Sequence, residues 1–538
     1  EALKERNPNG TLSFEKIADE KNVTYSSAAW VWRKLYLEAN VNYDRTFGDH
    51  RVGGLLFYYI EDTSETGADK SMNAIPKRYQ SLSGRFTYGF KDTYFWDLNF
   101  GLNGSENFEP GKQYGFFPAG AFAWVPSSYE FMRENVSWLN FLKLRVSYGV
   151  VGNDRISSRR FPYLTLIKEE NASNPWGGTG SLTEEQVGAN NLMWEKAKKF
   201  DVGMDLHLFK DKFTLTLDYF KDTRDGIFQE RKQIPDYVGL IQMPYGNIGR
   251  MKSWGADGNM EFYQQIGKDA HVILRSTLSK NKILNWEDTK KPYTYLENNG
   301  YANNVQRGFV AMGLFKDQQD VEMSPTQFGT VRPGDIKYRD INGDGKITDD
   351  DKVPLFAYSG VPQLMYGIGA EFRYKSWTLN VLFKGTGRNK FLYGGSDGKS
   401  FDGYMPFNQK DKGNIMTIAY NPENRWISAE YSGNQATENP NARFPRLYYG
   451  KNENNTKPST FWMGDARYLR LQELSLAYNL KVPALQRILG INSMNIQLMC
   501  ESLAVWDSVK IFDPEQATSC GQAYPLPARY SLQLYLNF

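Results

Sequence analysis

The sequence predicts an all-β protein, and more narrowly a large antiparallel transmembrane β-barrel. Three observations predict this fold class: apolar and polar residues alternate along many segments, aromatic residues are frequent, and the last predicted strand ends on Phe538. The chain of 538 residues contains 34 Tyr, 33 Phe and 13 Trp, and its mean hydropathy is -0.58. A membrane-spanning helix needs about 20 consecutive apolar residues. Because no such run occurs, a membrane protein of this composition has to cross with strands, whose aromatic residues form girdles at both interfaces.

A clear strand is predicted at 142–148. Leu142 and Leu144 alternate there with Lys143 and Arg145. In a soluble sandwich the charged face would meet water and the apolar face a second sheet. In a barrel the apolar face meets lipid, and the charged face meets a polar lumen. One strand does not separate the two folds, so the prediction depends on how often the pattern is repeated.

A hairpin is predicted around the short turn at 210–212. In its second strand Leu215 and Leu217 alternate with Thr216 and Asp218. The strand before the turn has the same alternation, so the two strands share one apolar face. In the barrel interpretation the two leucines face lipid, and Thr216 and Asp218 face the lumen.

The same alternation continues toward the end of the chain. It recurs at 377–384 and 494–500, and it returns in the last strand at 530–538. At 468–478 the apolar residues change parity, which predicts a β-bulge. In all there are about fourteen to sixteen candidate strands, each long enough for the roughly 10 residues of a tilted membrane strand.

Long polar segments separate some of these strands. The two longest run over about 285–362 and 385–465. Such connections would be unusual inside a compact soluble domain. Membrane barrels have long extracellular loops and short periplasmic turns, so we expect both segments to be extracellular loops.

The composition argues against several functions. Lys and Arg number 64 against 61 Asp and Glu, and a net charge of +3 predicts no nucleic-acid surface. Only two Cys occur, Cys500 and Cys520, so there is no thiol metal site, although one bridge between them stays possible in an oxidising compartment. No phosphate-binding loop and no nucleophile with its base is evident, and we therefore predict no enzymatic activity.

One motif has the spacing of a metal site. Carboxyl and amide oxygens occupy positions 1, 3 and 5 of a twelve-residue loop, a glycine occupies position 6, and a carboxylate occupies position 12, as in EF-hand calcium loops. The predicted Ca²⁺ ligands are Asp340, Asn342, Asp344, the Lys346 carbonyl and Asp351. No amphipathic helix pair flanks the loop, so the ion would brace a long loop rather than act as a switch. A turn rich in Asp, Asn and Gly that binds no ion is the alternative.

Several segments resemble the SusC/RagA family of TonB-dependent outer-membrane transporters. Each is short, but they follow one another over most of the chain. They are the segments Phe122-Ala-Trp-Val-Pro-Ser127, Leu142-Lys-Leu-Arg-Val-Ser-Tyr-Gly149, Gly152-Asn-Asp154, Leu192-Met-Trp-Glu195, Asp218-Tyr-Phe220 with Asp225, Gly246-Asn-Ile-Gly249, Pro333-Gly-Asp-Ile-Lys-Tyr338, Ala442-Arg-Phe-Pro-Arg446, Gly464-Asp-Ala-Arg-Tyr-Leu-Arg-Leu471, Asp513-Pro-Glu515 and the end of the chain from Tyr524 to Phe538.

The resemblance implies a barrel of the 22-stranded transporter kind with a plugged lumen. Neither a plug domain nor a TonB-contact segment is recognisable, so we expect residues 1–538 to be the C-terminal portion of the barrel. The implied activity is active import of glycans or oligopeptides across the outer membrane of a Gram-negative, Bacteroidetes-like cell. The implied partners are a SusD-like substrate-binding lipoprotein, the plug-bearing N-terminal part of the same protein, TonB acting through that part, and the outer-membrane lipid.

Other classes of protein remain open at this point. A passive porin or an adhesin barrel would show the same strands, and a soluble carbohydrate-binding β-protein would share much of the alternation. The substrate is not specified. Four aromatic residues of the long loops could stack on sugars, meet a lipoprotein or only pack the loops. They are Tyr404, Trp426, Tyr448 and Tyr449.

Overall fold

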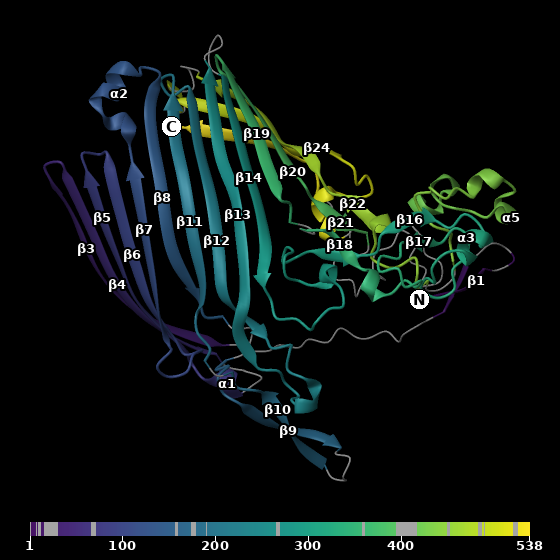
Figure 1. Ribbon diagram of the computed structural model, residues 1–538. Coiled ribbons are helices and arrows are strands. Elements are labelled where there is room, and N and C mark those ends of the chain that lie inside the picture. Colours follow the sequence, from purple (N-terminus) through teal and green to yellow (C-terminus); the bar gives the residue numbers. More distant parts are fainter. Residues whose placement is uncertain are drawn as a thin grey trace.

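One antiparallel sheet of fifteen strands dominates the computed structural model of this protein (Figure 1). The strand order from one edge to the other is β25-β24-β23-β20-β19-β14-β13-β12-β11-β8-β7-β6-β5-β4-β3. The strands are β3 Trp32–Phe47, β4 His50–Glu65, β5 Lys77–Phe90, β6 Tyr94–Ser105, β7 Tyr114–Trp124, β8 Leu139–Asn153, β11 Glu195–Leu208, β12 Phe213–Glu230, β13 Tyr245–Gln264, β14 Ala270–Asn285, β19 Leu364–Tyr374, β20 Trp377–Gly387, β23 Tyr468–Leu480, β24 Ser493–Asp507 and β25 Arg529–Asn537. The antiparallel all-β architecture predicted from the sequence is confirmed.

Among the elements whose bounds the structure describes, ten shorter strands and five short helices lie outside this sheet. The strands are β1 Ala2–Arg6, β2 Leu12–Glu15, β9 Leu166–Ser173, β10 Thr179–Gln186, β15 Gln306–Gly308, β16 Ala311–Leu314, β17 Ile336–Tyr338, β18 Val353–Phe356, β21 Lys390–Leu392 and β22 Met463–Asp465. The helices are α1 Ser71–Ala74, α2 Glu130–Asn135, α3 Gln318–Glu322, α4 Thr417–Tyr420 and α5 Ala429–Ser432. The 3-10 helices include η2 Asp236–Val238, η4 Asp349–Asp351 and η8 Pro514–Ser519.

The structure describes most, but not all, of the chain. The described residues are 2–6, 8, 12–15, 31–65, 71–155, 160–173, 179–189, 191–264, 270–357, 361–393, 417–448, 452–481, 487–488, 490–519, 524 and 526–538. None of the helices in these ranges is long and apolar enough to span a membrane.

The connections at the two ends of the sheet differ greatly in length. At the upper end in Figure 1, short turns join β3 to β4, β11 to β12 and β19 to β20. At the opposite end, residues 286–363 join β14 to β19 and residues 388–467 join β20 to β23. We refer to these as the short-turn end and the long-loop end. In outer-membrane barrels the short turns are periplasmic and the long loops extracellular.

Apolar outward residues alternate with polar inward residues along β12. On β12, Leu217 and Tyr219 are 46% and 45% exposed, whereas Asp218 between them points the other way and meets Arg145 of β8. Leu215 has the same parity as Leu217, and Thr216 the same parity as Asp218. The strand alternation predicted for this hairpin is therefore confirmed.

The phase slip in β23 is a β-bulge, as predicted. Leu471 faces Phe383 of β20, and Glu473 faces the adjacent Leu382, so Gln472 between them has no partner on β20. The extra residue reverses the parity of the strand beyond it. The apolar residues on either side of the bulge can therefore share one face.

The sheet has two free edges among the described strands, β3 and β25. All sixteen residues of β3 are exposed, and most of β25 is exposed as well. Figure 1 shows the sheet curved around an open space, with β3 on one side of the opening. A hydrogen-bonding edge cannot face lipid, because no water there satisfies its N–H and C=O groups.

The long loops are not loose connections, because they share a hydrophobic core of their own. We call the part formed by described residues 306–356, 390–393 and 417–463 the loop assembly. Its core consists of Phe309, Leu314, Ile336, Tyr338, Ile347, Leu392, Ala419, Trp426, Ala442, Phe444 and Trp462. This core joins the β14–β19 connection to the β20–β23 connection, and Figure 1 shows the assembly beside the long-loop end of the sheet.

Candidate functional site

The inward face of the sheet carries charges that pair across strands. The Arg145 guanidinium on β8 donates through Nε to Asp205 of β11 at 3.0 Å and through Nη2 to Asp218 of β12 at 3.2 Å. Arg85 on β5 forms a second ion pair with Asp97 on β6, at 2.5 Å. The inward orientation predicted for Arg145 is confirmed.

These pairs border a concavity of about 420 Å³ on the inward face. Charges of both signs line it, since Asp44, Arg51, Lys143 and Asp201 contribute as well. The small residues Ala121 and Ala123 of β7 also line it. A surface of this kind offers hydrogen-bond donors and acceptors to a polar solute or to a polar protein surface.

Gly203 is what allows Arg145 to reach Asp218. It lies directly between them in the register, opposite Arg145 on one side and Asp218 on the other. A Cβ at this position would lie 2.8 Å from the Arg145 guanidinium and would also overlap the Asp218 carboxylate. Because glycine has no side chain, it leaves the space through which the Arg145 side chain crosses β11 to reach Asp218.

We expect Gly203→Ala to lower the free energy of unfolding by about 1–3 kcal/mol, because the added methyl overpacks the ion pair. Gly367→Ala is the matched control, since its Cβ would meet only one backbone atom, at 3.6 Å. The control should leave stability unchanged or raise it by about 0.5–1 kcal/mol. Urea unfolding in lipid vesicles measures both, and equal effects of the two substitutions would contradict the role given to Gly203.

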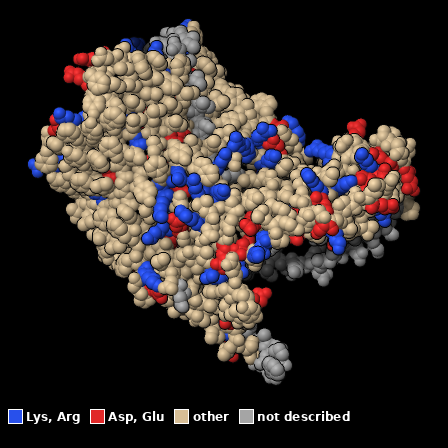
Figure 2. Space-filling view, viewed as in Figure 1, with Lys and Arg blue, Asp and Glu red and all other residues tan. Residues whose placement is uncertain are grey.

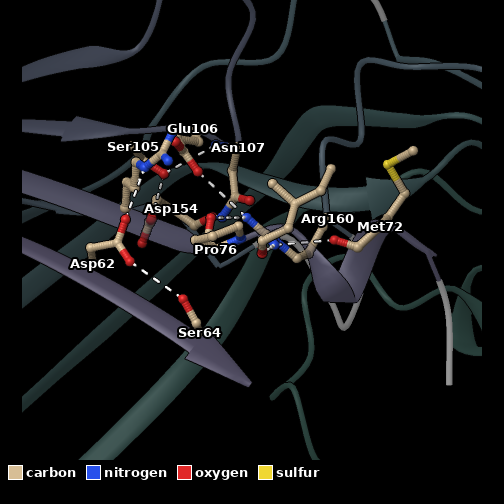
Figure 3. A network of polar contacts seen from close by, with 11 residues as sticks. Asp62, Ser64, Met72, Pro76, Ser105, Glu106, Asn107, Asp154 and Arg160 are labelled. Carbon is tan, nitrogen blue, oxygen red and sulfur yellow. Dashed lines mark hydrogen bonds and ion pairs between the residues drawn. The ribbon is translucent and has the colours of Figure 1, made fainter. Parts of the chain in front are cut away.

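At the long-loop end, Arg160 ties together the connections that follow β4, β6 and β8 (Figure 3). Its guanidinium donates to the backbone carbonyls of Met72 at 3.1 Å, of Ile75, and of Pro76 at 3.3 Å. Nη2 also donates to Glu106 at 3.4 Å, and the side chain is only 11% exposed. Backbone carbonyls that would otherwise lie unsatisfied at the rim are thus bound by one cation.

Asp154 adds a second tie to the same region (Figure 3). The Ser105 hydroxyl donates to its carboxylate at 2.6 Å, and the Asn107 side-chain amide donates to its backbone carbonyl at 3.0 Å. The β6–β7 connection is therefore anchored to the end of β8 through both groups of one residue.

Asp335 is the centre of the corresponding network in the loop assembly. Its carboxylate is completely buried. It accepts hydrogen bonds from Arg446 Nη2 at 3.0 Å, Asn455 Nδ2 at 2.8 Å, Asn452 Nδ2 at 3.2 Å and the Arg332 backbone N–H at 2.8 Å. A buried carboxylate with one cation and several neutral donors is stable only as a complete set.

The connection after β24 is held against the sheet by a buried arginine. Arg470 of β23 pairs with Asp513 at 2.6 Å and with Glu515 at 3.0 Å, and its side chain is 3% exposed. Lys384 of β20 also reaches Glu515, at 2.9 Å. These contacts hold the start of η8 against the neighbouring strands β23 and β20.

Glu287 anchors the β12–β13 connection to the residues after β14. Its carboxylate accepts hydrogen bonds from the backbone N–H groups of Lys232 and Gln233, both at 3.0 Å, and pairs with Arg231 at 2.8 Å. Burial raises the pKa of this carboxyl, but the bonds from Gln233, Arg231 and Lys232 outweigh burial and hold the pKa below its ordinary value.

A lowered pKa means that this carboxylate stabilises the fold above the ordinary glutamate pKa of about 4.3, and that the stabilisation is lost as the pH falls through the lower folded value. We expect Glu287→Gln to lower the melting temperature at pH 7. The deficit should shrink as the pH is taken below about 4. The exposed Glu430 provides the control substitution, Glu430→Gln. A deficit that stays constant with pH would contradict the prediction.

The predicted calcium loop folds as a compact turn closed by its own hydrogen bonds. Asp340 accepts from the N–H groups of Gly343 at 2.6 Å and Gly345 at 2.8 Å, and Asp344 accepts from Lys346 N–H at 2.9 Å. Asn342 Oδ1 accepts from the N–H of Asp344 at 3.1 Å.

Asp351, at position 12 of the loop, is completely buried and caps η4. It also accepts from the N–H groups of Ile341 and Thr348, both at 2.8 Å. Within the described residues, no three His, Cys, Asp or Glu side chains gather closely enough to hold a metal ion.

Two of the four loop aromatics singled out above, and one cysteine, fall outside the described residues; these are Tyr404, Tyr449 and Cys520. Trp426 is 5% exposed and packs its ring over Gly334 in the core of the loop assembly. A buried ring cannot stack on a sugar in this structure, so packing is the role that the structure gives it. Tyr448 borders a polar concavity of about 400 Å³ that Arg332 and Arg446 also line.

The comparison with protein families decides which family this chain belongs to. A family model described as "TonB dependent receptor-like, beta-barrel" matches residues 6–404. The chain belongs to the TonB-dependent receptor β-barrel family. It is an outer-membrane protein, as its resemblance to SusC/RagA transporters implied.

Curated TonB-dependent receptors are similar to this chain over most of its length. TonB-dependent receptor P26 of Formosa agariphila is 28% identical over 468 residues, which is 84% of this chain and 44% of that protein. TonB-dependent receptor SusC of Bacteroides thetaiotaomicron is 24% identical over 327 residues, 58% of this chain and 31% of SusC. The chain thus spans about half the length, or less, of the curated relatives that it matches.

The solved structure of the RagAB peptide importer in the "closed-closed" state shares the fold. It superposes with a TM-score of 0.69 at 19% identity, covering 95% of this chain and 56% of that chain. The RagAB peptide transporter structure gives a TM-score of 0.66 with the same coverage. The match over almost the whole chain supports the strand order given above.

In this TonB-dependent receptor chain, several of the motifs that resemble the SusC/RagA family connect neighbouring strands and loops through packing and hydrogen bonds. Trp194 packs with Phe108 and Phe117 below the rim, and its Nε1 donates to the Gln113 carbonyl at 3.2 Å. Asn247 donates to the carbonyls of Met193 at 2.7 Å and Gly226 at 2.8 Å. The motif pairs 333–338 with 442–446, and 464–471 with 513–515, meet through Asp335 and Arg470.

Sequence reasoning missed Arg160 and the role of Gly203. Arg160 lies in a polar segment with no periodic pattern, and nothing near it distinguishes it from its neighbour Arg159. Gly203 does carry a signal, because it is the glycine among the inward positions of β11, where glycine marks a close approach of another group.

Proposed function

We propose that this chain forms a large part of the barrel of a TonB-dependent transporter that imports large nutrients, glycans or oligopeptides, across the outer membrane. The observation that carries the proposal is the inward face, which carries paired charges and a polar concavity. Membership of the TonB-dependent receptor family supports active transport. The similarity to SusC and to the RagAB peptide importer favours large substrates.

The proposal includes closure of the sheet by further strands. The edges β3 and β25 cannot both face lipid unpaired. A TonB-dependent barrel of the 22-stranded kind with a plugged lumen would pair both edges and fill the inward space. The chain covers about half of its curated relatives, which leaves room for those strands and for a plug domain in the whole protein.

Energy and substrate capture are assigned to partners. TonB would act through the plug-bearing N-terminal part, and a SusD-like lipoprotein would cover the extracellular side at the loop assembly. The loop assembly has a buried core and fixed internal ties, so it offers a stable surface to such a lid.

Uptake by cells tests the proposed transport. A strain lacking the full-length protein should lose import of the labelled substrate, and a strain lacking TonB should lose it to the same extent. The substrate class is identified first, by mass spectrometry of the ligand that co-purifies with the native complex. Import that continues without TonB would favour the alternative, a passive porin.

Native purification from the outer membrane tests closure and partners together. Mass spectrometry of every band should show the plug-bearing part of the same protein and a lid-like lipoprotein. A monodisperse closed barrel formed by residues 1–538 alone would refute the proposed closure.

We further propose that the loop from Asp340 to Asp351 binds one Ca²⁺ through Asp340, Asn342, Asp344, the Lys346 carbonyl and Asp351. The ligand types and their spacing support it. In a crystal grown with calcium, we expect an ion with oxygen distances of about 2.3–2.6 Å. Isothermal titration of the Asp344→Ala variant should show weakened binding, whereas water alone at the site in the calcium-grown crystal would defeat the proposal.

A further inference from the structure

The outward face of β11 to β14 changes from apolar to basic toward the long-loop end. Side chains directly opposite one another in the register form rows across these strands. From the membrane core outward the rows are Met204, Leu217 and Gly258; then Val202, Tyr219, Ala256 and Leu278; then Phe200, Lys221, Trp254 and Lys280; then Lys198, Thr223, Lys252 and Lys282; and finally Lys196, Asp225, Arg250 and Asn285.

We call the basic residues of the last three rows the basic rim. They are Lys196, Lys198, Lys221, Arg250, Lys252, Lys280 and Lys282. The rows contain a single carboxylate, Asp225, which pairs with Lys198 at 2.9 Å and with Arg250 at 2.7 Å. For the other five lysines, the described part of the chain supplies no ion pair. Figure 2 shows Lys and Arg gathered where Figure 1 places the lower halves of β11 to β14.

The excess of positive charge is confined to the outward face of β11 to β14 at the long-loop end. At the long-loop end of β4 and β5, the outward Arg78 is neutralised by Asp62 at 3.0 Å. On the inward side of β11 and β12, the basic Lys199 is accompanied by Asp201 and Asp222. The basic rim is therefore not a general property of the rim or of these strands.

The position of the basic rim decides what can neutralise it. Lysine is costly among lipid tails, so these rows must lie at the level of the headgroups. Because the long loops of such barrels are extracellular, the headgroups are those of the outer leaflet. Trp254 lies in the first of the three rows, with Lys252 Nζ 5.0 Å from its ring, as expected at a membrane interface.

We infer that the basic rim binds the phosphate groups of the phosphorylated glycolipid in the outer leaflet of the outer membrane. Lysine ammonium groups bind phosphate as point charges on flexible stems, so several of them can share one phosphate without fixed geometry. The binding orients and anchors the barrel wall in the membrane. It rests on the outer-membrane location and on the orientation of the loops, and not on what the protein transports.

The test uses the full-length protein purified from its own outer membrane, with native mass spectrometry of the retained glycolipid. The double variant Lys252→Gln/Lys282→Gln should retain less, by roughly fivefold for each lysine removed. Lys199→Gln is the matched control, because it lies on the same strand as Lys198 and faces inward. Equal retention in the double variant and the control would overturn the inference.

A second measurement keeps the inference testable if the double variant does not fold. The wild-type protein in vesicles is offered the glycolipid with its phosphates or after enzymatic dephosphorylation. A lipid site is supported if the protein retains the phosphorylated form preferentially. This preference should persist when inorganic phosphate is present at its concentration in ordinary buffers. Equal retention of both forms, or displacement by inorganic phosphate, would overturn it.

Discussion

Replacing Arg446 by methionine is expected to destabilise the loop assembly by about 3–5 kcal/mol, because it leaves the buried Asp335 carboxylate without its cation. Arg446 Nε lies 2.9 Å from Asp335 Oδ1, and Nη2 donates to Oδ2. Asn452 and Asn455 would remain as neutral donors, but two amides do not replace a charge in a dry environment. The loss should be local, since the loop assembly has its own core.

Hydrogen exchange measures this effect amide by amide. Protection of Ile336 and Tyr338 should fall in Arg446→Met, while the amides of β11 and β12 keep theirs. Arg467→Met is the matched control. Arg467 pairs with Asp465 at 2.5 Å, but its side chain is 64% exposed, and such pairs contribute about 0–1 kcal/mol. Similar losses from the two substitutions would show that Asp335 does not depend on Arg446.

Leu215→Arg should cost about 2–4 kcal/mol in a membrane, whereas Thr216→Arg should be tolerated. Leu215 lies in the outward row next to that of Leu217, well inside the apolar part of the face. Thr216 lies on the inward face opposite Asp205, so a guanidinium there finds a carboxylate and water.

Folding into lipid vesicles, followed by urea titration, measures both substitutions. The comparison is stringent because the two residues are adjacent and receive the same side chain. Comparable damage from both would mean that the outward face of β12 does not meet lipid, and would favour a soluble sandwich. Little damage from either would place Leu215 outside the hydrocarbon layer.

The candidate site illustrates what short motifs can and cannot predict. Asp335 and Arg446 each belong to a segment that resembles the SusC/RagA family, but nothing in the sequence indicates that they meet across 111 residues of chain. The same is true of Arg470 with Asp513. Contacts between loops depend on how the loops pack, and a local pattern contains no information about that packing.

The calcium loop shows the opposite situation. Its residues are adjacent, so the sequence alone predicts which oxygens lie near one another. In the structure these oxygens accept bonds from N–H groups of the same turn, as in the contacts of Asp340 with Gly343 and Gly345. The hydrogen bonds of the turn do not test whether it binds an ion, and Ca²⁺ binding stays a prediction.

The sequence by itself determined the antiparallel all-β class, the positions and apolar faces of the strands in which the alternation is clearest, such as β12 and β25, and the bulge in β23. It could do so because strand alternation and turns depend on residues within about ten positions of one another. Only the tertiary structure decided that Gly203 leaves space for the Arg145 side chain and that the long loops share one core. It also showed that the lysines of β11 to β14 form one surface. Each of these depends on register between strands, which places residues far apart in the chain within contact distance and which no single strand encodes.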